Sequence, residues 1–392
     1  MKFDYFYGGH VAMDDLGFAG RPVDERVEAD EHLASVFAEA RAMAELMDAA
    51  GYDTLWLAEH HFQREGYGGI PNIPMLAVYL AQHTQRLHLG SMFNTVPTWH
   101  PLRLAEDFAL ADILTEGRFR FGIGRGYIGR ELATLGAPLE GDPANRALFE
   151  EQVEILFKAW NEPSFAHCGP HYELPAKVAH RRDSLEEITL VPRPRNRPVE
   201  CWQPIFSANP RGIAFMIKHG IKGVVPGGGR AMAIAERWRD ELARAGRDAE
   251  MSVASIGDAL GAGLALVLQV HLADTQEQAI REAGVWFEEQ LKVLAPLGRM
   301  PALTEAQIAA TYDGAAAAQA GLPTVRDLVR EGAWLCGPPE HVAARLAETQ
   351  AQLPGLERVT IGAGALGIPP EAIRQTIEWF GRDVLPQFKE AS

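Results

Sequence analysis

The sequence predicts an α/β fold, a (β/α)8 TIM barrel in which a ring of helices covers eight parallel strands. Short apolar runs alternate with amphipathic helical segments along the chain, and eight such pairs can be counted. The 392 residues are 47% hydrophobic, which is enough for a large buried core. An open doubly wound sheet shows the same alternation but usually has roughly five to seven strands, so the count favours the barrel.

Each strand is expected where an apolar run is short, and each helix where the apolar residues recur at helical spacing. The expected strands are Phe3–Tyr7, Asp53–Ala58, Leu87–Phe93, Arg118–Ile123, Cys201–Phe206, Gly223–Val225, Leu264–Leu272 and Val359–Ile361. The helices expected after them are Ser35–Ala50, Ile73–His83, Leu102–Leu114, Asn145–Trp160, Gly212–His219, Ala231–Ala245, Glu277–Leu291 and Glu371–Phe380. The first of these helices should end at Gly51.

Two long segments interrupt the alternation, and we expect both to be insertions in a single barrel domain that spans residues 1–392. The first, about 162–200, is rich in Pro, His and Arg and lies between helix 4 and strand 5. The second, about 295–333, lies between helix 7 and strand 8. Loops of this length are usually either functional lids or packing insertions.

The composition excludes several classes of protein. A formal net charge of −15, with no run rich in Lys or Arg, argues against a nucleic-acid surface. No apolar stretch reaches the roughly 20 residues needed to span a bilayer. The N-terminus reads as a strand and lacks the features of a signal peptide. The three cysteines are few and far apart, which argues against a disulfide framework or a zinc ribbon, so we expect a cytoplasmic protein.

Strand 2 is followed by Glu59-His60-His61-Phe62, and active sites of barrels lie at the carboxyl ends of the strands. A histidine there could act as a general acid or base, because its unperturbed pKa is about 6.5. The local sequence fits a histidine bonded to a neighbouring carbonyl equally well. Glu59 could orient the histidine or pair with an arginine elsewhere. Adjacent residues of a strand point to opposite faces, so His60 and His61 could not easily bind one metal ion, and no metal site is expected.

A phosphate site is predicted where strands 4 and 5 end. Strand 4 leads into Gly122-Ile123-Gly124-Arg125-Gly126, in which glycines allow close approach and Arg125 offers a planar fork. The spacing is not that of a dinucleotide fingerprint, and no helix begins directly with it. Strand 5 leads into Ser207-Ala208-Asn209 just before a helix, where Ser and Asn are ordinary caps but free backbone N–H groups can also bind an anion. In a closed barrel strands 4 and 5 are neighbours, so both segments should converge on one phosphate.

Three separated motifs resemble the bacterial luciferase-like flavin-dependent monooxygenase family. They are Glu59-His60-His61-Phe62, then Pro97-Thr98 with His100-Pro101 and Ala105-Glu106-Asp107, then Gly117-Arg118-Phe119-Arg120-Phe121-Gly122-Ile123 with Arg125-Gly126. They occur in the family's order and on the predicted strand ends. Fainter agreement continues through 207–220 and 337–343, so the resemblance covers most of the chain.

The resemblance implies an FMN cofactor across the carboxyl ends of the strands. Arg125 would hold its phosphate, and His60, with Glu59 beside it, falls on the family's catalytic histidine. The resemblance also assigns Phe93, Gly124, Ala208 and Asn209 to the cofactor. We expect Asn94 and Ser207, which lie next to these positions, to contact it as well. In the luciferases the Met92–Phe93 peptide is a non-prolyl cis bond. Gly124 replaces a cysteine of the true luciferases, so light emission is not implied, and Ala208-Asn209 replaces an acidic–serine pair, which leaves backbone contacts to the phosphate.

The function expected from this resemblance is a two-component monooxygenase. A separate NAD(P)H:flavin reductase would supply reduced FMN as a co-substrate, and O2 would then be used to oxidise a moderately hydrophobic organic small molecule. One alternative is a deazaflavin-dependent hydride-transfer oxidoreductase, because that group shares the barrel. A second is a non-catalytic flavin-binding protein. Barrels of this family commonly form dimers, so a homodimer is expected.

Overall fold

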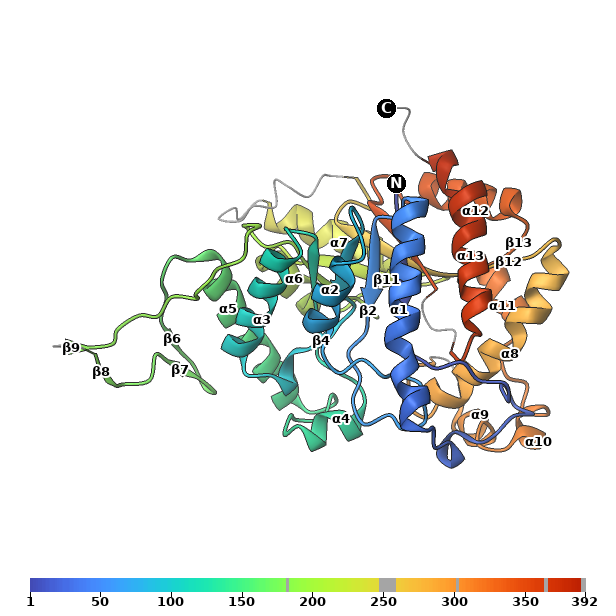
Figure 1. The fold of residues 1–392 in the computed structure, drawn as a ribbon, viewed down its shortest axis with the longest axis horizontal. Helices are drawn as coiled ribbons and strands as arrows, with labels where there is room; N and C mark the ends of the chain where they lie inside the picture. The colour runs from blue at the N-terminus through green and yellow to red at the C-terminus, as the bar shows by residue number, and fades with distance from the viewer. Residues whose placement is uncertain (181–182, 247–258, 301–302, 363–365, 389–392) are drawn as a thin grey trace.

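Eight parallel strands close into a barrel, which confirms the predicted fold (Figure 1). The computed structural model describes residues 1–180, 183–246, 259–300, 303–362 and 366–388. Around the ring lie β1 (Lys2–Tyr7), β2 (Thr54–Leu57), β3 (His88–Ser91), β5 (Phe119–Gly124), β10 (Cys201–Pro204), β11 (Lys222–Pro226), β12 (Leu264–Leu272) and β14 (Arg358–Ile361). The pairing of β5 with β10 and of β14 with β1 completes the ring.

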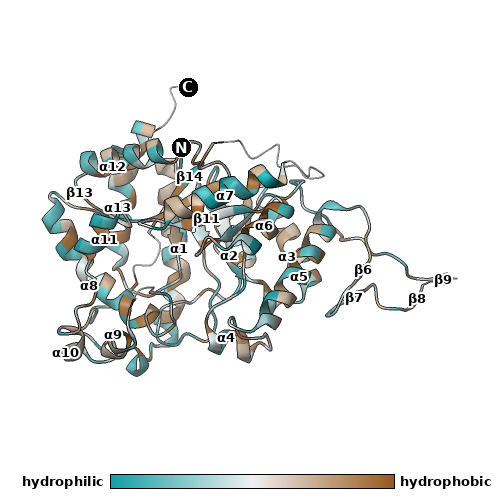
Figure 2. Ribbon diagram, turned by 180° about the vertical axis from the view of Figure 1, so that it is seen from behind, coloured by the Kyte–Doolittle hydropathy of each residue, from teal (hydrophilic) through white to brown (hydrophobic). Residues whose placement is uncertain are grey.

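The helices that cover the barrel lie where the sequence predicts them, with shifted ends. They are α1 (Asp30–Ala50), α2 (Ile73–Ala81), α3 (Pro101–Leu114), α5 (Pro143–Asn161), α6 (Pro210–Lys218), α7 (Ala231–Ala245), α8 (Gln276–Leu294) and α13 (Pro370–Asp383). Proline in the first turn and a side-chain cap such as Asp142 or Asn209 fix several of the starts. Helices such as α7 mix hydrophilic and hydrophobic residues along their length (Figure 2). The first and last helices, α1 and α13, pack side by side.

Several elements were not predicted. A short helix, α4 (Gly129–Thr134), follows β5 directly. The predicted third strand, Leu87–Phe93, is shorter, and the chain pairs with β5 again at β4 (Asn94–Thr95). The connection between α8 and β14 is longer than the predicted insertion at 295–333. It contains the helices α9 (Glu305–Ala310), α10 (Gly314–Ala317) and α11 (Val325–Glu331), then β13 (Trp334–Gly337) and α12 (Pro339–Gln352).

The extra strand β13 exists because β12 is long enough to pair with two strands on the same side. The first half of β12 pairs with β14, from Ala265 to Leu268. Its second half pairs with β13, from Gln269 to Leu272. The barrel therefore keeps eight strands in its ring, and β13 extends the wall at the carboxyl end of β12.

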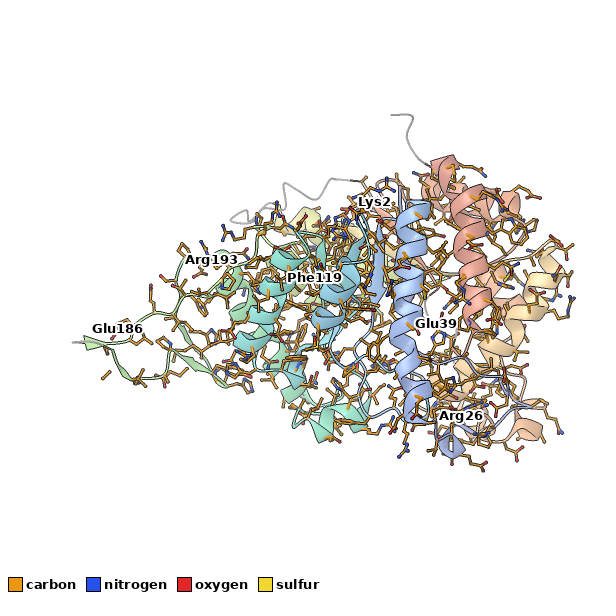
Figure 3. The ribbon with its side chains drawn as sticks, in the orientation of Figure 1. Lys2, Arg26, Glu39, Phe119, Glu186 and Arg193 are labelled. Atoms are coloured by element: carbon orange, nitrogen blue, oxygen red, sulfur yellow. The ribbon has the colours of Figure 1, made fainter. Side chains whose placement is uncertain are left out.

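The first insertion, 162–200, forms an arm that projects from the barrel (Figure 1). It carries two short hairpins, β6–β7 (His167–Cys168 with Glu173–Leu174) and β8–β9 (Ala179–His180 with Asp183–Ser184). Figure 3 shows Glu186 near the tip of the arm and Arg193 closer to the barrel. The base of the arm is attached to α5, where the Glu151 carboxylate accepts a hydrogen bond from the backbone N–H of Tyr172 at 3.0 Å.

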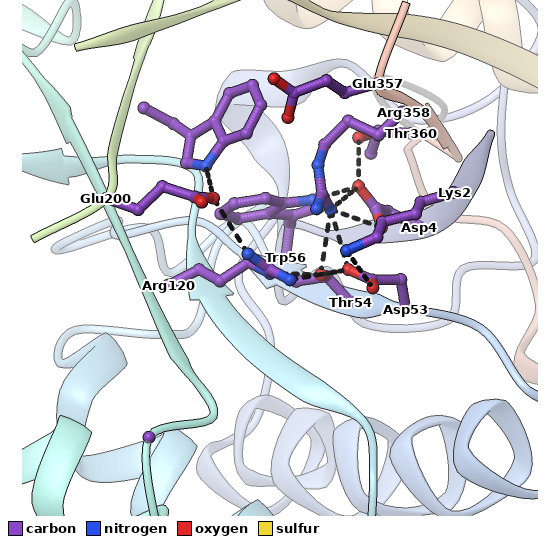
Figure 4. A network of polar contacts seen from close by, with 12 residues as sticks. Lys2, Asp4, Asp53, Thr54, Trp56, Arg120, Glu200, Glu357, Arg358 and Thr360 are labelled. Carbon is purple, nitrogen blue, oxygen red and sulfur yellow. Dashed lines mark hydrogen bonds and ion pairs between the residues drawn. The ribbon is translucent and has the colours of Figure 1, made fainter. Parts of the chain in front are cut away.

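A buried network of charges closes the barrel at the amino ends of the strands (Figure 4). At its centre Arg358 Nη1 donates to Asp4 (2.8 and 2.9 Å) and to Asp53 (3.1 Å). The Arg358 guanidinium also lies over the rings of Trp56 and Trp202, 5.9 and 5.2 Å from their centroids. Figure 3 shows Lys2 at this end of the molecule and Arg26 at the opposite end, near the start of α1. We call this network the barrel floor.

Candidate active site

The loops after the strands meet at the end of the barrel opposite the floor. The Met92–Phe93 peptide after β3 is cis, as the resemblance implied. Phe93 packs beside a buried cluster that contains Trp56 and Trp202. A Cβ placed on Gly124, at the end of β5, would lie 3.2 Å from Phe93 Cβ, so the two residues are in close contact. The structure thus brings together two of the positions that the sequence assigns to a flavin ring.

Glu59 is buried and holds the loops after β2 and β3 together. Its two carboxylate oxygens accept four hydrogen bonds, from Asn94 Nδ2 (2.6 Å), Thr95 N (3.1 Å), Trp99 Nε1 (2.9 Å) and His61 Nε2 (2.9 Å). The hydrogen bond with Glu59 raises the pKa of His61. The sequence left open which group Glu59 would orient, and the structure pairs it with His61 and not with His60.

Asn94 is fully buried beside this carboxylate, at a position that the sequence assigns to the cofactor. Its amide nitrogen donates a hydrogen bond to Glu59, whereas its Oδ1 has no hydrogen-bond partner among the described residues. A buried polar atom without a partner costs roughly 1–3 kcal/mol. A ligand that donates a hydrogen bond at this point would remove that cost.

His60 is held by a carboxylate from a different element. Its Nδ1 lies 3.3 Å from Oε1 of Glu131, which belongs to the unpredicted helix α4. On the other side of the imidazole, a Cβ added to Gly68 would come within 2.6 Å of His60 Cβ, so only glycine leaves room there. The ring of Tyr127 meets the His60 ring edge-on at 6.1 Å, and burial raises the pKa of this tyrosine to about 12. His60 is therefore fixed on three sides.

Glu131 is suited to keep one tautomer of His60. Burial opposes its ionisation, but the hydrogen bonds from His60, from Gln63 Nε2 (2.8 Å) and from the backbone N–H of His61 (2.9 Å) place its pKa below the ordinary value. An ionised carboxylate only accepts hydrogen bonds, so the proton of a neutral His60 lies on Nδ1. The Nε2 atom of His60 then remains available as a proton acceptor.

Arginines gather where β5 and β10 end, in what we call the basic corner. Arg125 follows β5, and its Nη2 lies 3.8 Å from Glu140. Burial lowers the pKa of Arg125, and the nearby charges of Arg146 and Arg299 lower it further, against the opposite effect of Glu140 and Glu150. The charge of this corner therefore favours a bound anion.

The segment Ser207–Asn209 lies at the neighbouring strand end, because β10 pairs with β5. Asn209 caps α6 by accepting a hydrogen bond from the backbone N–H of Arg211 at 3.0 Å. Arg211 in turn donates to Glu150 at 3.0 Å, and Glu150 also lies 3.6 Å from Arg146. The amino end of α6 and Arg125 thus belong to one charged cluster. Ser207 and Asn209 are exposed and Ala208 is half-buried, so the backbone of this turn remains accessible.

A cavity of about 370 Å³ opens beside this site, within the usual range for small-molecule pockets. Its walls come from the loops after β1, β2 and β5 and from the end of α8 with the following insertion. Gln63 lines the cavity and donates to Glu131, so the cavity is connected to the His60–Glu131 pair. Apolar side chains such as Tyr67, Ile128 and Leu297 make up much of the lining.

Among the side chains that complete this arrangement, sequence reasoning missed Glu131, Arg146 and Arg299. Arg146 had a usable signal, because Asp142-Pro143 is a typical helix start and places Arg146 in the first turn of α5. Neither of the other two lies in an element that the sequence predicts. Among the described residues, no group of three or more His, Cys, Asp or Glu side chains could hold a metal ion.

A closed barrel with a basic corner, a paired histidine and an apolar cavity at the carboxyl ends of its strands defines a class. It is that of (β/α)8 barrels whose functional site lies at the carboxyl ends of the strands. The model of the luciferase-like monooxygenase family matches residues 20–355. The chain therefore belongs to the luciferase-like monooxygenase family. In the part of the chain that the structure describes, none of the helices combines the length and apolar character needed to cross a membrane.

Comparisons with individual proteins agree with this family. A 4-hydroxyprotoasukamycin monooxygenase from Streptomyces nodosus subsp. asukaensis is 26% identical over 357 residues, which cover 88% of this chain and 85% of the relative. Three other curated relatives are matched over only 36–44% of their own length.

Solved structures share the fold at lower identity. The oxygenating constituent of 3,6-diketocamphane monooxygenase from Pseudomonas putida, in complex with FMN, has a TM-score of 0.72 at 19% identity, with 99% of both chains covered. An F420-dependent secondary alcohol dehydrogenase has a TM-score of 0.63 at 14% identity, also with 99% of both chains covered. These two similarities show a common barrel, which serves an FMN-binding protein and an F420-dependent one.

Proposed function

We propose that this chain is the oxygenating component of a two-component monooxygenase. It would take reduced FMN from a separate NAD(P)H:flavin reductase and use O2 to oxidise a moderately hydrophobic organic small molecule. When bound, reduced FMN supplies the electrons that activate O2. The chain's own residues bind and orient the reactants, exclude water and exchange a proton.

The charge of the basic corner is the observation that carries the proposal. Four guanidinium groups contact two carboxylates there: Arg125 and Arg299 contact Glu140, and Arg146 and Arg211 contact Glu150. Taken together these six groups have a formal charge of +2. A phosphate monoester carries about −1.5 to −2 at neutral pH, so it would balance this excess. The free turn at 207–209 adds backbone donors near the amino end of α6.

The remainder of the site suits a flavin ring next to this phosphate. Gly124 and Phe93 are in contact at one strand end, and no described residue donates a hydrogen bond to Asn94 Oδ1. His60 Nε2 would accept or donate a proton for the bound reactants, while Glu131 holds Nδ1. The adjoining cavity would take the organic substrate, and its apolar lining supports a moderately hydrophobic compound.

The function is tested by supplying the purified chain with reduced FMN and O2 against a panel of hydrophobic compounds. We expect oxygen from labelled O2 in a product, detected by mass spectrometry, only when the chain is present. A parallel assay replaces FMN by reduced F420. Hydride transfer with F420 and no oxygen incorporation with FMN would establish the deazaflavin alternative. Flavin binding without turnover by either cofactor would indicate a non-catalytic flavin-binding protein.

Arg125→Ala should weaken FMN binding by about 10- to 100-fold, because a hydrogen bond to a charged group contributes roughly 1.5–3 kcal/mol. Riboflavin lacks the phosphate, so its affinity should stay nearly unchanged. Titration of each flavin by its fluorescence measures both affinities. The matched control is Arg103→Ala, which removes an exposed arginine whose partner, Glu106, lies on the same helix. An unchanged FMN affinity in Arg125→Ala would disprove the phosphate assignment.

Glu131→Gln should change the pH dependence of turnover without abolishing FMN binding. The amide can still contact His60 Nδ1, but it no longer stabilises a protonated imidazole by its charge. The pH dependence of turnover should therefore change, and the maximal rate should fall by about tenfold, the effect of losing one hydrogen bond to a charged group. Rates of product formation measured across pH test this. A lower rate with an unmoved pH profile would show that Glu131 only supports the structure.

We also propose that the chain forms a homodimer. Large apolar side chains are exposed on the neighbouring helices α2 and α3: Met75, Tyr79, Leu110 and Leu114. Such groups of exposed apolar residues typically mark protein interfaces. Light scattering coupled to size-exclusion chromatography gives the mass in solution, and a mass of one chain would exclude the dimer.

A further inference from the structure

Arg299 connects the basic corner to the wall of the cavity, although it comes from an insertion outside the barrel core. Its guanidinium lies over the ring of Tyr127 at 4.6 Å and over that of Phe206 at 5.6 Å. Tyr127 follows β5 and Phe206 follows β10. Arg299 therefore rests on the two strand ends between which the phosphate is proposed to bind.

The position of Arg299 depends on a carboxylate that it shares with Arg125. Both guanidinium groups contact Glu140, Arg299 through a short hydrogen bond and Arg125 at 3.8 Å. Burial and the charge of Arg146 lower the pKa of Arg125, and the like charge of Arg299 adds to this effect. The Nε of Arg299 is buried and has no partner among the described residues. A phosphate in this corner would compete with Glu140 for Arg299.

The backbone at Arg299 is joined tightly to the end of α8. The backbone N–H of Arg299 donates to the carbonyl of Leu294 at 2.9 Å, and that of Gly298 donates to Ala295 at 3.0 Å. Gly298 has a φ of 67°, a left-handed conformation that glycine adopts readily. Pro296 and Leu297, within this same turn, line the cavity. Arg299 and two residues of the cavity wall therefore belong to one short hydrogen-bonded turn.

The other side of the wall is anchored independently. Lys292 also lines the cavity, and its Nζ donates to the carbonyls of Gly17 (2.9 Å) and Arg21 (2.7 Å) and to Glu289 (2.8 Å). All three of its donors are used within the protein. The wall therefore has one fixed attachment at Lys292 and a second attachment, through Arg299, at the proposed phosphate site.

We propose that Arg299 is a positioning residue that couples phosphate binding to the shape of the substrate cavity. The phosphate of the cofactor draws Arg299 from Glu140, and the turn 294–299 then sets the cavity wall for substrate. This inference rests on the proposed function. Linkage requires the effect to be reciprocal, so substrate in the cavity tightens the binding of FMN by the same factor. Riboflavin, which lacks the phosphate, does not produce the effect.

The test reports on the wall itself and needs no substrate. Leu297→Cys places a thiol on the wall, in a Cys168→Ser background that removes the exposed natural cysteine; Cys201 and Cys336 are buried. The rate of alkylation by iodoacetamide is measured alone, with FMN, with riboflavin and with inorganic phosphate. FMN and inorganic phosphate should each change the rate by about fivefold or more, which corresponds to the lower range of coupling between sites. Riboflavin should leave it unchanged.

Two further variants, made in the same background, separate coupling from general disturbance. Arg299→Ala should keep much of the FMN affinity through Arg125 and Arg146, but the alkylation rate should no longer respond to FMN. Arg326→Ala, which removes an exposed arginine paired with Glu277 in the same insertion, should respond as the parent does. Arg299→Lys keeps the charge but loses the planar group that stacks on Tyr127, so its response should be reduced.

The outcomes distinguish this inference from the proposed function. If FMN binds by fluorescence titration but leaves the alkylation rate of the parent unchanged, the coupling is wrong and the proposed function stands. If Arg299→Ala responds to FMN as the parent does, Arg299 is not the coupling residue. If FMN does not bind at all while inorganic phosphate changes the rate, the coupling stands and the proposed cofactor is wrong.

Discussion

His60→Ala should reduce product formation by roughly 10²–10⁴-fold while FMN affinity stays within about twofold of the parent value. The two ring nitrogens of His60 can donate or accept a proton, which is the role proposed for this residue. It is also held in one orientation by Glu131, Tyr127 and the close approach of Gly68. The proposed phosphate site lies elsewhere, in the basic corner, so removal of the imidazole should not release the cofactor.

The measurement combines a flavin titration with product analysis, both on the same preparation. His60→Gln serves as a second variant, because it fills more of the space left by the ring and can still contact Glu131, yet it cannot carry the proton. Product formation should fall by a similar factor in both variants. His83→Ala is the matched control, since His83 lies near the end of α2 and packs against Tyr79, away from the strand ends. Normal turnover in His60→Ala would remove His60 from the reaction.

Arg358→Ala should lower the free energy of unfolding by about 3–5 kcal/mol, the usual cost of removing one partner from a buried ion pair. The Arg358 side chain is 2% exposed, and Asp4 is fully buried beside it. Alanine would leave the Asp4 carboxylate without its charged partner and would remove the stacking on Trp56 and Trp202. The nearby carboxylates Asp4 and Asp53 hold the pKa of Arg358 above its ordinary value, against the effect of burial.

Urea unfolding followed by circular dichroism measures this loss. The control is Arg345→Ala, an exposed residue of α12 paired with Glu348, which should change stability by less than about 0.5 kcal/mol. Adding Asp4→Asn to Arg358→Ala should restore part of the stability, because the amide removes the unpaired charge. If the single variant loses no more stability than the control, the floor does not hold the barrel together.

The loss should also become smaller at acid pH. Burial opposes the ionisation of Asp53, but Arg120 and Arg358 outweigh it and hold its pKa well below the usual range. A depressed pKa contributes stability above the unfolded value near 3.8, and that contribution is lost as the pH falls through the folded value. Arg358→Ala removes part of this contribution. The parent and the variant should therefore differ less in stability as the pH falls below about 4.

The sequence predicted the barrel because its strongest signal, the alternation of strands and helices, does not depend on distant contacts. All eight strands of the ring and the helices that follow them were expected. By contrast, β13 is defined by its pairing with the second half of β12, from Gln269 to Leu272. That pairing brings together residues far apart in the chain, and nothing in the local pattern at Trp334–Gly337 indicates it.

The site likewise contains residues that the sequence could place and residues whose partners it could not identify. Positions at predicted strand ends, such as Arg125 and Phe93, could be placed at the mouth from the order of the strands alone. The partner of His60 could not be identified from the sequence, because Glu131 is 71 residues away and belongs to a short helix without a clear periodic signal. The partner of Glu59 was left open for a related reason. Glu59 could contact either His61 or His60, because the side chains of adjacent residues point in different directions. Which of the two it meets depends on how the chain turns after β2.

The barrel floor has a consequence for how this protein can diverge. The ion network (Figure 4) lies at the amino ends of the strands, whereas the proposed chemistry and the cavity lie at the carboxyl ends. Substitutions in the cavity wall therefore leave the buried charges of the floor untouched, and the two sets of positions can vary independently. A lineage can change its substrate range by altering the loops after β1, β2 and α8 while the same ring of strands stays closed. A library restricted to those loops should accordingly contain many folded members with altered specificity.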